Sequence, residues 1–308
     1  MINNLIDISS MQGNEFIHHQ MLENASHYAA FSLGQKGGNP AGVFQVSDLI
    51  SDAEMLAFAD KLGYSETAFI MGRNKEWEIR YWSPKTEVPF CGHATLAVGA
   101  HLAWEQGAGN FLFQTKAGQV KVQARLLEQG QLAGVSFLSP PCHHRRAESS
   151  LVRKMMDLSD LFPGDLDRNH LPVIANAGAN HLLIFINSRA KLQEIEYDFV
   201  GVRNLMLEED LLTISLLFKQ DKALFYSRNL FPVGGVYEDP ATGAAAAALG
   251  GFWRARYEPT SFSFKILQAE HLPTASSLEV RYDTQTGNGV WVGGTVRKYS
   301  STPKNQPN

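Results

Sequence analysis

One arrangement of residues occurs twice in this chain and constrains its fold more than any other feature. Residues 81–104 read YWSPKTEVPFCGHATLAVGAHLAW, and residues 230–253 read LFPVGGVYEDPATGAAAAALGGFW. Each stretch has an aromatic residue and a proline, an acid near a proline, a glycine among small residues, and an apolar run ending in tryptophan. A Gly/Asn element precedes each copy, at 37–41 and 176–181. Two copies predict two similar halves whose helix starts face a shared small-molecule cleft.

The bulk composition limits the class of protein. With 308 residues, the chain favours two domains or one large one, and 44% hydrophobic content supports a sizeable core. A net charge of −4 does not suggest a nucleic-acid surface. The start of the chain does not resemble a signal peptide, and no apolar run is long enough to span a membrane. With only 2 cysteines, we expect a reducing compartment, the cytoplasm.

Periodicity and turn residues predict an α+β fold with antiparallel sheets and one central helix per half. Strand-like segments alternate with five expected helices, which lie at 52–63, after Gly92, at 151–161, at 188–206 and after Asp239. The stretch His143-His144-Arg145-Arg146 is expected to be a solvated loop near a domain boundary.

The sequence Asp239-Pro240-Ala241-Thr242-Gly243 marks the start of the second central helix. Asp239 suits the N-cap position, and Pro240 suits the first helical position. A well-capped helix alone explains these residues. The alanines that follow let the helix lie deep against a sheet, where its free backbone N–H groups can bind an anion such as a carboxylate.

His93 and Glu66 are the titratable candidates. At a helix start, the helix dipole lowers the pKa of His93 and favours neutral imidazole, although a histidine that caps its own helix explains the position equally well. Glu66 precedes Phe69 and Ile70 in an apolar strand, where burial raises the pKa of a carboxyl group that shuttles protons. The alternative is a glutamate on the solvent face of an edge strand. Glu87 is a weaker acid candidate.

Four blocks in this order resemble the phenazine-biosynthesis PhzF-like isomerase family, from about Tyr28 to Lys298: GNPAGV (38–43), SETAF (65–69), PKTEVPFCGHAT (84–95) and EDPATGAA (238–245). The resemblance implies the diaminopimelate epimerase-like fold, in which two pseudo-symmetric domains each wrap a curved sheet around a central helix. It also implies a homodimer that needs no cofactor.

The resemblance further implies a set of site residues. Glu66 matches the family's proton-carrying glutamate, and His93 and Asp239 match its catalytic helpers. We expect a small carboxylate-bearing substrate to contact the helix starts and the first Gly/Asn element, at Asn39, Gly92, Ala94, Thr95, Thr242, Gly243 and Ala244. A serine of the family falls at Ala244, so its hydroxyl group is missing here. No motif suggests a metal ion.

Two other functions stay open. The first is an amino-acid racemase or epimerase that uses a pair of cysteines, although only Cys91 lies beside a helix start and Cys142 lies far from the motif. The second is a binding protein without turnover. For the domains, we expect an N-terminal extension at 1–25, a first domain at 26–135 joined by the last strand at 288–298, a second domain at 136–287, and a flexible tail at 299–308.

Overall fold

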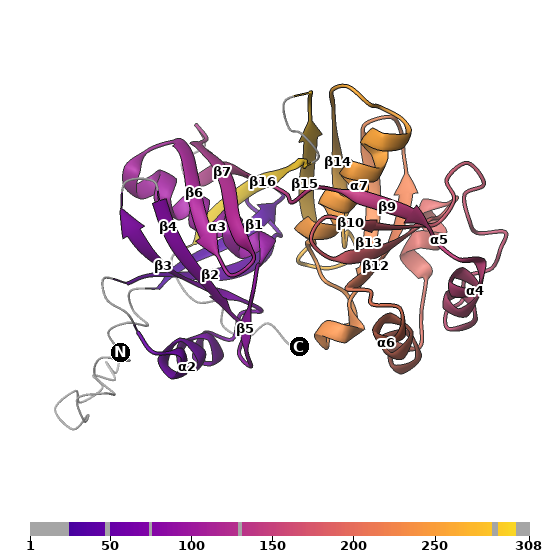
Figure 1. The fold of residues 1–308 in the computed structure, drawn as a ribbon, viewed down its shortest axis with the longest axis horizontal. Coiled ribbons are helices and arrows are strands. Elements are labelled where there is room, and N and C mark those ends of the chain that lie inside the picture. Colours follow the sequence, from indigo (N-terminus) through magenta and orange to yellow (C-terminus); the bar gives the residue numbers. More distant parts are fainter. Residues whose placement is uncertain (1–24, 47–49, 74–75, 129–130, 285–288, 300–308) are drawn as a thin grey trace, which may run out of the picture.

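The computed structural model describes residues 25–46, 50–73, 76–128, 131–284 and 289–299. The strands of these residues form one sheet that runs through two lobes lying side by side, each with a helix inside it (Figure 1). Except for Ala25 and Tyr299, the expected N-terminal extension and C-terminal tail lie outside the described residues. In the described residues, no helix is long and apolar enough to cross a membrane.

The first lobe contains the elements up to β8, in the order β1 (Ser26–Ser32), β2 (Asn39–Gln45), α2 (Asp52–Leu62), β3 (Thr67–Arg73), β4 (Glu76–Trp82), β5 (Glu87–Val88), α3 (Gly92–Gln106), β6 (Gly109–Thr115), β7 (Gly118–Leu126) and β8 (Leu132–Leu138). Helix α2 begins at a capping box between Ser51 and Glu54 and ends at Gly63, which adopts the left-handed conformation.

The second lobe contains β9 (His143–Arg146), α4 (Ser149–Asp157), β10 (Val173–Asn176), β11 (Asn180–Phe185), α5 (Arg189–Glu194), α6 (Phe199–Glu208), β12 (Thr213–Lys219), β13 (Leu224–Leu230), a 3-10 turn η2 (Pro232–Gly234), α7 (Gly243–Arg256), β14 (Phe262–Gln268) and β15 (Ser276–Tyr282). The last strand, β16 (Trp291–Tyr299), returns to the first lobe, where it pairs with β8 and β1.

The two halves repeat one topology. In the first half, the parallel pair β2–β3 is joined through α2, and the parallel pair β4–β6 through α3. In the second half, β11–β12 is joined through α5 and α6, and β13–β14 through α7. A parallel pair needs such a crossover connection. Most other pairs are antiparallel, which confirms the α+β fold expected from the periodicity of the sequence.

The central helices α3 and α7 are buried on nearly all sides, as expected for helices that are apolar all round. Each has a glycine at its first position and another at its eighth, which are Gly92 and Gly99 in α3 and Gly243 and Gly250 in α7. The eighth-position glycines pack against valines. An added Cβ at either Gly99 or Gly250 would lie 2.6 Å from a valine Cγ1 atom. The glycines therefore set how closely each helix approaches its sheet.

The expected loop at 143–146 and the expected helix at 188–206 differ from the structure, and the helix expected at 151–161 is α4, which begins at Ser149 and ends at Asp157. Residues 143–146 form β9, which pairs antiparallel with β10 just as β16 pairs with β1, although its side chains are exposed. The expected helix at 188–206 is two helices, because Asp198 caps a new helix by accepting a hydrogen bond from the Val200 N–H.

Candidate active site

The starts of the two central helices meet. A Cβ atom added at Gly92 would lie 3.6 Å from the Cα of Gly243. The ring of Phe137, on β8, lies beside both positions, 3.3 Å from an added Cβ at Gly92 and 3.1 Å from one at Gly243. Neither N-cap side chain, Cys91 for α3 or Thr242 for α7, accepts a hydrogen bond from its own helix. The positive ends of two helix dipoles are therefore directed at one place.

Asp239 lies just before this junction, but it is not the N-cap as the sequence predicted. Helix α7 begins at Gly243, so Pro240 precedes the helix. The Asp239 carboxylate instead accepts a hydrogen bond from the Thr242 hydroxyl (2.5 Å) and a longer one from the Ala241 N–H (3.4 Å). Because these bonds form in the turn before the helix, they delay its start. Burial raises the pKa of Asp239, which the Thr242 hydrogen bond opposes.

His93 occupies the second position of α3 and is only 6% exposed. Its Nδ1 atom is 3.3 Å from the Nδ2 of Asn39, which also donates to Asp239 Oδ1 at 3.3 Å. Because an amide nitrogen only donates, Nδ1 accepts, and the imidazole proton lies on Nε2. Nε2 is 3.3 Å from both the Ser65 hydroxyl and Glu66 Oε2. Burial lowers the pKa of His93, which favours the neutral ring.

Glu66 faces His93 from the other side of the site. It lies in the bend before β3, which begins at Thr67, so it is not within the strand as the sequence predicted. Its side chain is 22% exposed. Burial raises the pKa of Glu66, and hydrogen bonds from Ser65 and Cys91 partly oppose that shift. This carboxyl group is therefore both reachable and better able to hold a proton than an ordinary glutamate.

The remaining predicted contact residues line the two helix starts. Ala94 and Gly243 are buried, and Ala244 is partly exposed. The Thr95 hydroxyl is already occupied, because it lies 2.7 Å from the Tyr81 hydroxyl and donates to the Cys91 carbonyl at 2.7 Å. Asn39 joins the two halves of the site through its bonds to His93 and Asp239.

The second Gly/Asn element is engaged elsewhere. Asn180 donates to Asp210 and accepts from Asn176. His181 is fully buried, with its Nδ1 atom 2.7 Å from the Thr213 hydroxyl. Glu87 is paired with Arg80 and Lys116, and the hydrogen bond from Arg80 is the main cause that lowers its pKa. The carboxylate of Glu87 is therefore occupied by ion pairs that stabilise the structure.

The cysteines differ in their surroundings. The Cys91 thiol lies 3.3 Å from His93 Nδ1, and burial raises its pKa well above the ordinary value. Cys142 lies against the backbone of α7, with its thiol 3.6 Å from the Ala247 carbonyl. The position in α7 that corresponds to Cys91 is Thr242, whose hydroxyl donates to Asp239. The two helix starts therefore do not present a pair of thiols.

Three side chains at the site could together hold a metal ion. The ligand atoms of Glu66, Cys91 and His93 all lie within 4.8 Å of one another. A carboxylate, a thiolate and an imidazole are ligands that Zn²⁺ accepts. Two of the groups are also the main proton carriers of the site, so a bound metal would compete with acid–base chemistry.

Two residues at the site were missed from the sequence. The sequence did not single out Ser65 as a site residue, yet its hydroxyl lies 3.3 Å from His93 Nε2. Gln268 ends β14 and donates to the Asp239 carbonyl at 2.6 Å and to the Thr242 hydroxyl at 3.2 Å. Gln268 could have been identified from the sequence, because it follows Phe264 and Ile266 at the inward-facing positions of an alternating strand. A polar residue at such a position needs a hydrogen-bonding partner inside.

Comparison with known proteins gives a consistent result. The family model described as "Phenazine biosynthesis-like protein" matches residues 28–296. A relative from Halalkalibacterium halodurans, named an uncharacterized isomerase, is 30% identical over 239 residues, which cover 76% of this chain and 82% of the relative. A similarly named relative from Pseudomonas aeruginosa is 30% identical over 237 residues and also covers 76% and 82%.

Solved structures share the fold. A Bacillus anthracis phenazine biosynthesis protein of the PhzF family superimposes with a TM-score of 0.78 at 20% identity, over 90% of this chain and 96% of that chain. A probable proline racemase from Agrobacterium radiobacter gives a TM-score of 0.57 at 10% identity, over 90% and 91%. These likenesses confirm the epimerase-like architecture expected from the sequence.

Proposed function

Because this chain belongs to the phenazine biosynthesis-like protein family, we propose that it is a cofactor-independent isomerase that moves a proton and a double bond in a small carboxylate-bearing metabolite. The observation that carries this proposal is the convergence of Glu66, His93 and Asp239 where α3 and α7 meet. The names of the curated relatives support the reaction class.

Glu66 is the proposed general base and then the general acid. Its carboxylate removes a proton from a substrate carbon next to an activating group, which leaves an anion delocalised over the conjugated acid. The same carboxyl group returns the proton to a different carbon, so the double bond shifts and no other reactant is consumed. The raised pKa of Glu66 supports this role, because such a carboxylate is a stronger base than an exposed one.

The helix starts are proposed to stabilise the negative charge. Backbone N–H groups at Gly92 and Gly243 begin two helices that lie tip to tip, an arrangement suited to a carboxylate or an enolate oxygen. Preorganised donors of this kind lower a barrier by roughly 3–4 kcal/mol each. His93, neutral and protonated on Nε2, is a further donor that adds no charge to the site.

Asp239 is proposed to assist proton transfer and to hold Asn39 in place. The Asn39 amide links the Asp239 carboxylate to the His93 ring, so the three side chains are ordered together. Ala244 offers no hydroxyl group, so we expect this enzyme to orient its substrate through backbone N–H groups at that turn.

The decisive experiment compares wild-type protein with Glu66→Gln in heavy water. Each is incubated with a metabolite extract, and compounds that gain one mass unit are identified by mass spectrometry. We expect wild type to label a carboxylate-bearing compound and Glu66→Gln to lose this labelling, because an amide cannot accept the proton. Equal labelling by both proteins would reject the role of Glu66.

A matched substitution addresses the thiol alternative. We expect Cys91→Ser to retain proton exchange, because Thr242 gives no second thiol for a two-base mechanism. Loss of exchange in Cys91→Ser, with exchange retained in Glu66→Gln, would favour a racemase instead. Metabolite binding without exchange in wild type would favour a binding protein.

We also propose that the protein is a homodimer, on the basis of its family, and that it acts in the cytoplasm, on the basis of its composition. Light scattering coupled to size-exclusion chromatography measures the oligomeric state. A mass near the 34.1 kDa of one chain would contradict the dimer.

A further inference from the structure

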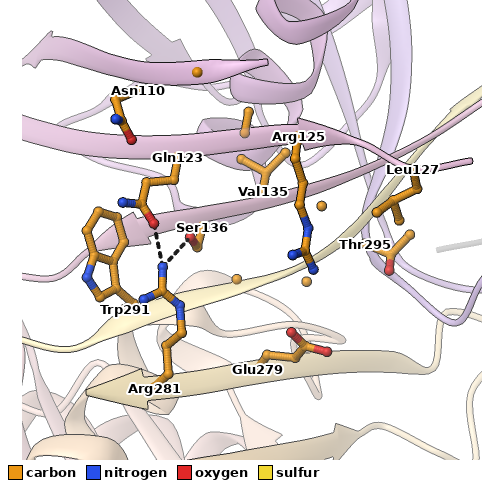
Figure 2. Close-up of a pocket in the computed structure, with 15 residues that line it drawn as sticks. Asn110, Gln123, Arg125, Leu127, Val135, Ser136, Glu279, Arg281, Trp291 and Thr295 are labelled. Carbon is orange, nitrogen blue, oxygen red and sulfur yellow. Dashed lines mark hydrogen bonds between the residues drawn. The ribbon is translucent and has the colours of Figure 1, made fainter. Parts of the chain in front are cut away.

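A groove of about 420 Å³ lies on the outer face of the sheet, away from the helix starts, where β7, β8, β16 and β15 run side by side. Figure 2 shows Arg125 entering the groove from one edge and Arg281 from the other. Arg125 belongs to β7 of the first lobe, and Arg281 belongs to β15 of the second. The groove therefore spans the junction between the lobes.

Two glycines lie in the floor of the groove. Gly134 on β8 and Gly293 on β16 lie between the two arginine-bearing strands. A Cβ atom added at Gly134 would lie 2.9 Å from the Nε of Arg125, so the Arg125 side chain lies directly over the backbone of Gly134. Side chains at these positions would fill the depression that the arginines border.

Neighbouring side chains hold Arg281 in place but use only one of its guanidinium nitrogen atoms as a donor. Its guanidinium group lies 4.9 Å from the ring centre of Trp291, its cross-strand partner. Its Nη2 atom donates to Gln123 Oε1 at 2.5 Å and to the Ser136 hydroxyl at 3.4 Å. Both acceptors are uncharged, and both bonds use the same nitrogen, whereas a guanidinium group has five N–H donors. The remaining fork suits an oxyanion.

The charges of the groove favour an anionic ligand. Partial burial lowers the pKa of Arg281, and the negative charges of Asp283 and Glu279 oppose that shift. The positive charge of Arg125 adds to the lowering, so the two guanidinium groups repel each other. Glu279 also faces the groove, but its carboxylate lies 3.5 Å from the Nζ of Lys265 on the neighbouring strand. An anion between the arginines would remove their repulsion.

We propose that this groove is a second ligand site, in which Arg125 and Arg281 together bind a small dianion, a phosphate monoester or a dicarboxylate, across the lobe junction. The site is separate from the helix starts. Phe137, the neighbour of Ser136 on β8, points to the opposite face of the strand, where it contacts Gly92 and Gly243. The proposal does not depend on the isomerase activity.

Titration calorimetry of the full chain tests this proposal, with inorganic phosphate and malonate as separate probes and with NaCl used to match the ionic strength. We expect saturable binding of at least one probe, which identifies the class of dianion. Arg125→Gln and Arg281→Gln should each weaken it by about tenfold or more, since each removes a charged donor fork. Added salt should weaken the binding as well.

The control is Arg203→Gln, an exposed arginine on α6, which should bind like wild type. If either groove variant unfolds, as judged by circular dichroism, the Arg→Lys variant at the same position replaces it. Lysine keeps the positive charge but lacks the paired N–H donors of the guanidinium group, so this variant should bind with an intermediate affinity. The proposal is overturned if wild type binds neither probe saturably. It is also overturned if binding is equal in the folded groove variants and wild type, which would place the anion elsewhere, such as at the helix starts.

Discussion

His101 is a buried histidine outside the candidate active site, and its hydrogen bonds are fully internal. Its Nδ1 atom is 2.9 Å from the Tyr28 hydroxyl, and its Nε2 atom is 3.4 Å from Gln45 Oε1. Burial lowers the pKa of His101 from 6.5 to about 4, with smaller effects from Glu105 and Lys298. Between pH 4 and pH 6.5, His101 is therefore mostly protonated in the unfolded chain and mostly neutral in the folded protein.

Stability should therefore depend on pH through this residue. Its folded-state pKa lies below the unfolded value, so its contribution is lost as pH falls from about 6.5 towards 4. A shift of this size corresponds to ~3 kcal/mol at most. We expect the stability advantage of wild type over His101→Gln, from urea unfolding, to shrink by up to that amount between pH 7.5 and 4.

The same substitution at the exposed His143 serves as the control. The difference between wild type and His143→Gln should stay nearly constant over this pH range. A constant difference for His101→Gln as well would contradict the assigned burial effect.

For the central helices, the close packing of Gly99 and Gly250 predicts an effect of alanine substitution opposite to the one that helix propensity predicts. Alanine is a better helix former than glycine, by roughly 1 kcal/mol. At Gly99 and Gly250, however, the new methyl group would lie 2.6 Å from a valine. Overpacking of this kind costs about 1–3 kcal/mol. We expect Gly99→Ala and Gly250→Ala to lower the free energy of unfolding in denaturant titrations.

Gly164 provides the matched comparison, because an added Cβ there meets nothing within 4 Å and its φ angle is not in the left-handed region. Gly164→Ala should leave stability unchanged or raise it by about 0.4–1 kcal/mol. Stabilisation by the two helix substitutions would show that the helices can move away from the sheets.

The order of the elements followed from the sequence wherever local signals were strong. The helix expected at 52–63 is α2, and the alternating strands were also predicted, because such elements are determined by neighbouring residues, as in the capping box at Ser51 and the left-handed Gly63 that bound α2. Strand β9 was not readable, because four polar residues become a strand only by pairing with the distant β10. The break between α5 and α6 was missed because the apolar pattern continues through it.

The candidate site was predictable in part, for the same reason. Glu66, His93 and Asp239 stood out through the four matching blocks, and the structure brings them together with Asn39. The start of α7 was misplaced by the turn at Asp239, whose carboxylate binds the Thr242 hydroxyl instead of capping the helix. Gln268 reaches the site from a strand that no motif marks.

For the whole molecule, Phe137 links the two halves. Its ring is 1% exposed, lies beside both helix starts, and contacts Phe90 edge to face. We expect Phe137→Ala to cost about 3–5 kcal/mol of stability, as for other buried phenylalanines. Proton exchange should also fall, because the tips of α3 and α7 lose the side chain that keeps them in register.

Phe113 is the control, since it is equally buried but lies on β6 within the first lobe. Phe113→Ala should cost similar stability, and the folded fraction should exchange protons like wild type. An equal loss of exchange in both folded variants would show that Phe137 acts only through general stability.

The return of β16 to the first lobe has a consequence for the order in which the protein can be completed. Residues near the beginning of the chain, such as His27, pair with residues near its end, such as Tyr299. Strand β16 lies between β8 and β1, so the first lobe can be completed only after β16 has been translated, whereas β10 to β15 can already pair with one another. Of the two lobes, the one that is translated earlier is therefore completed later.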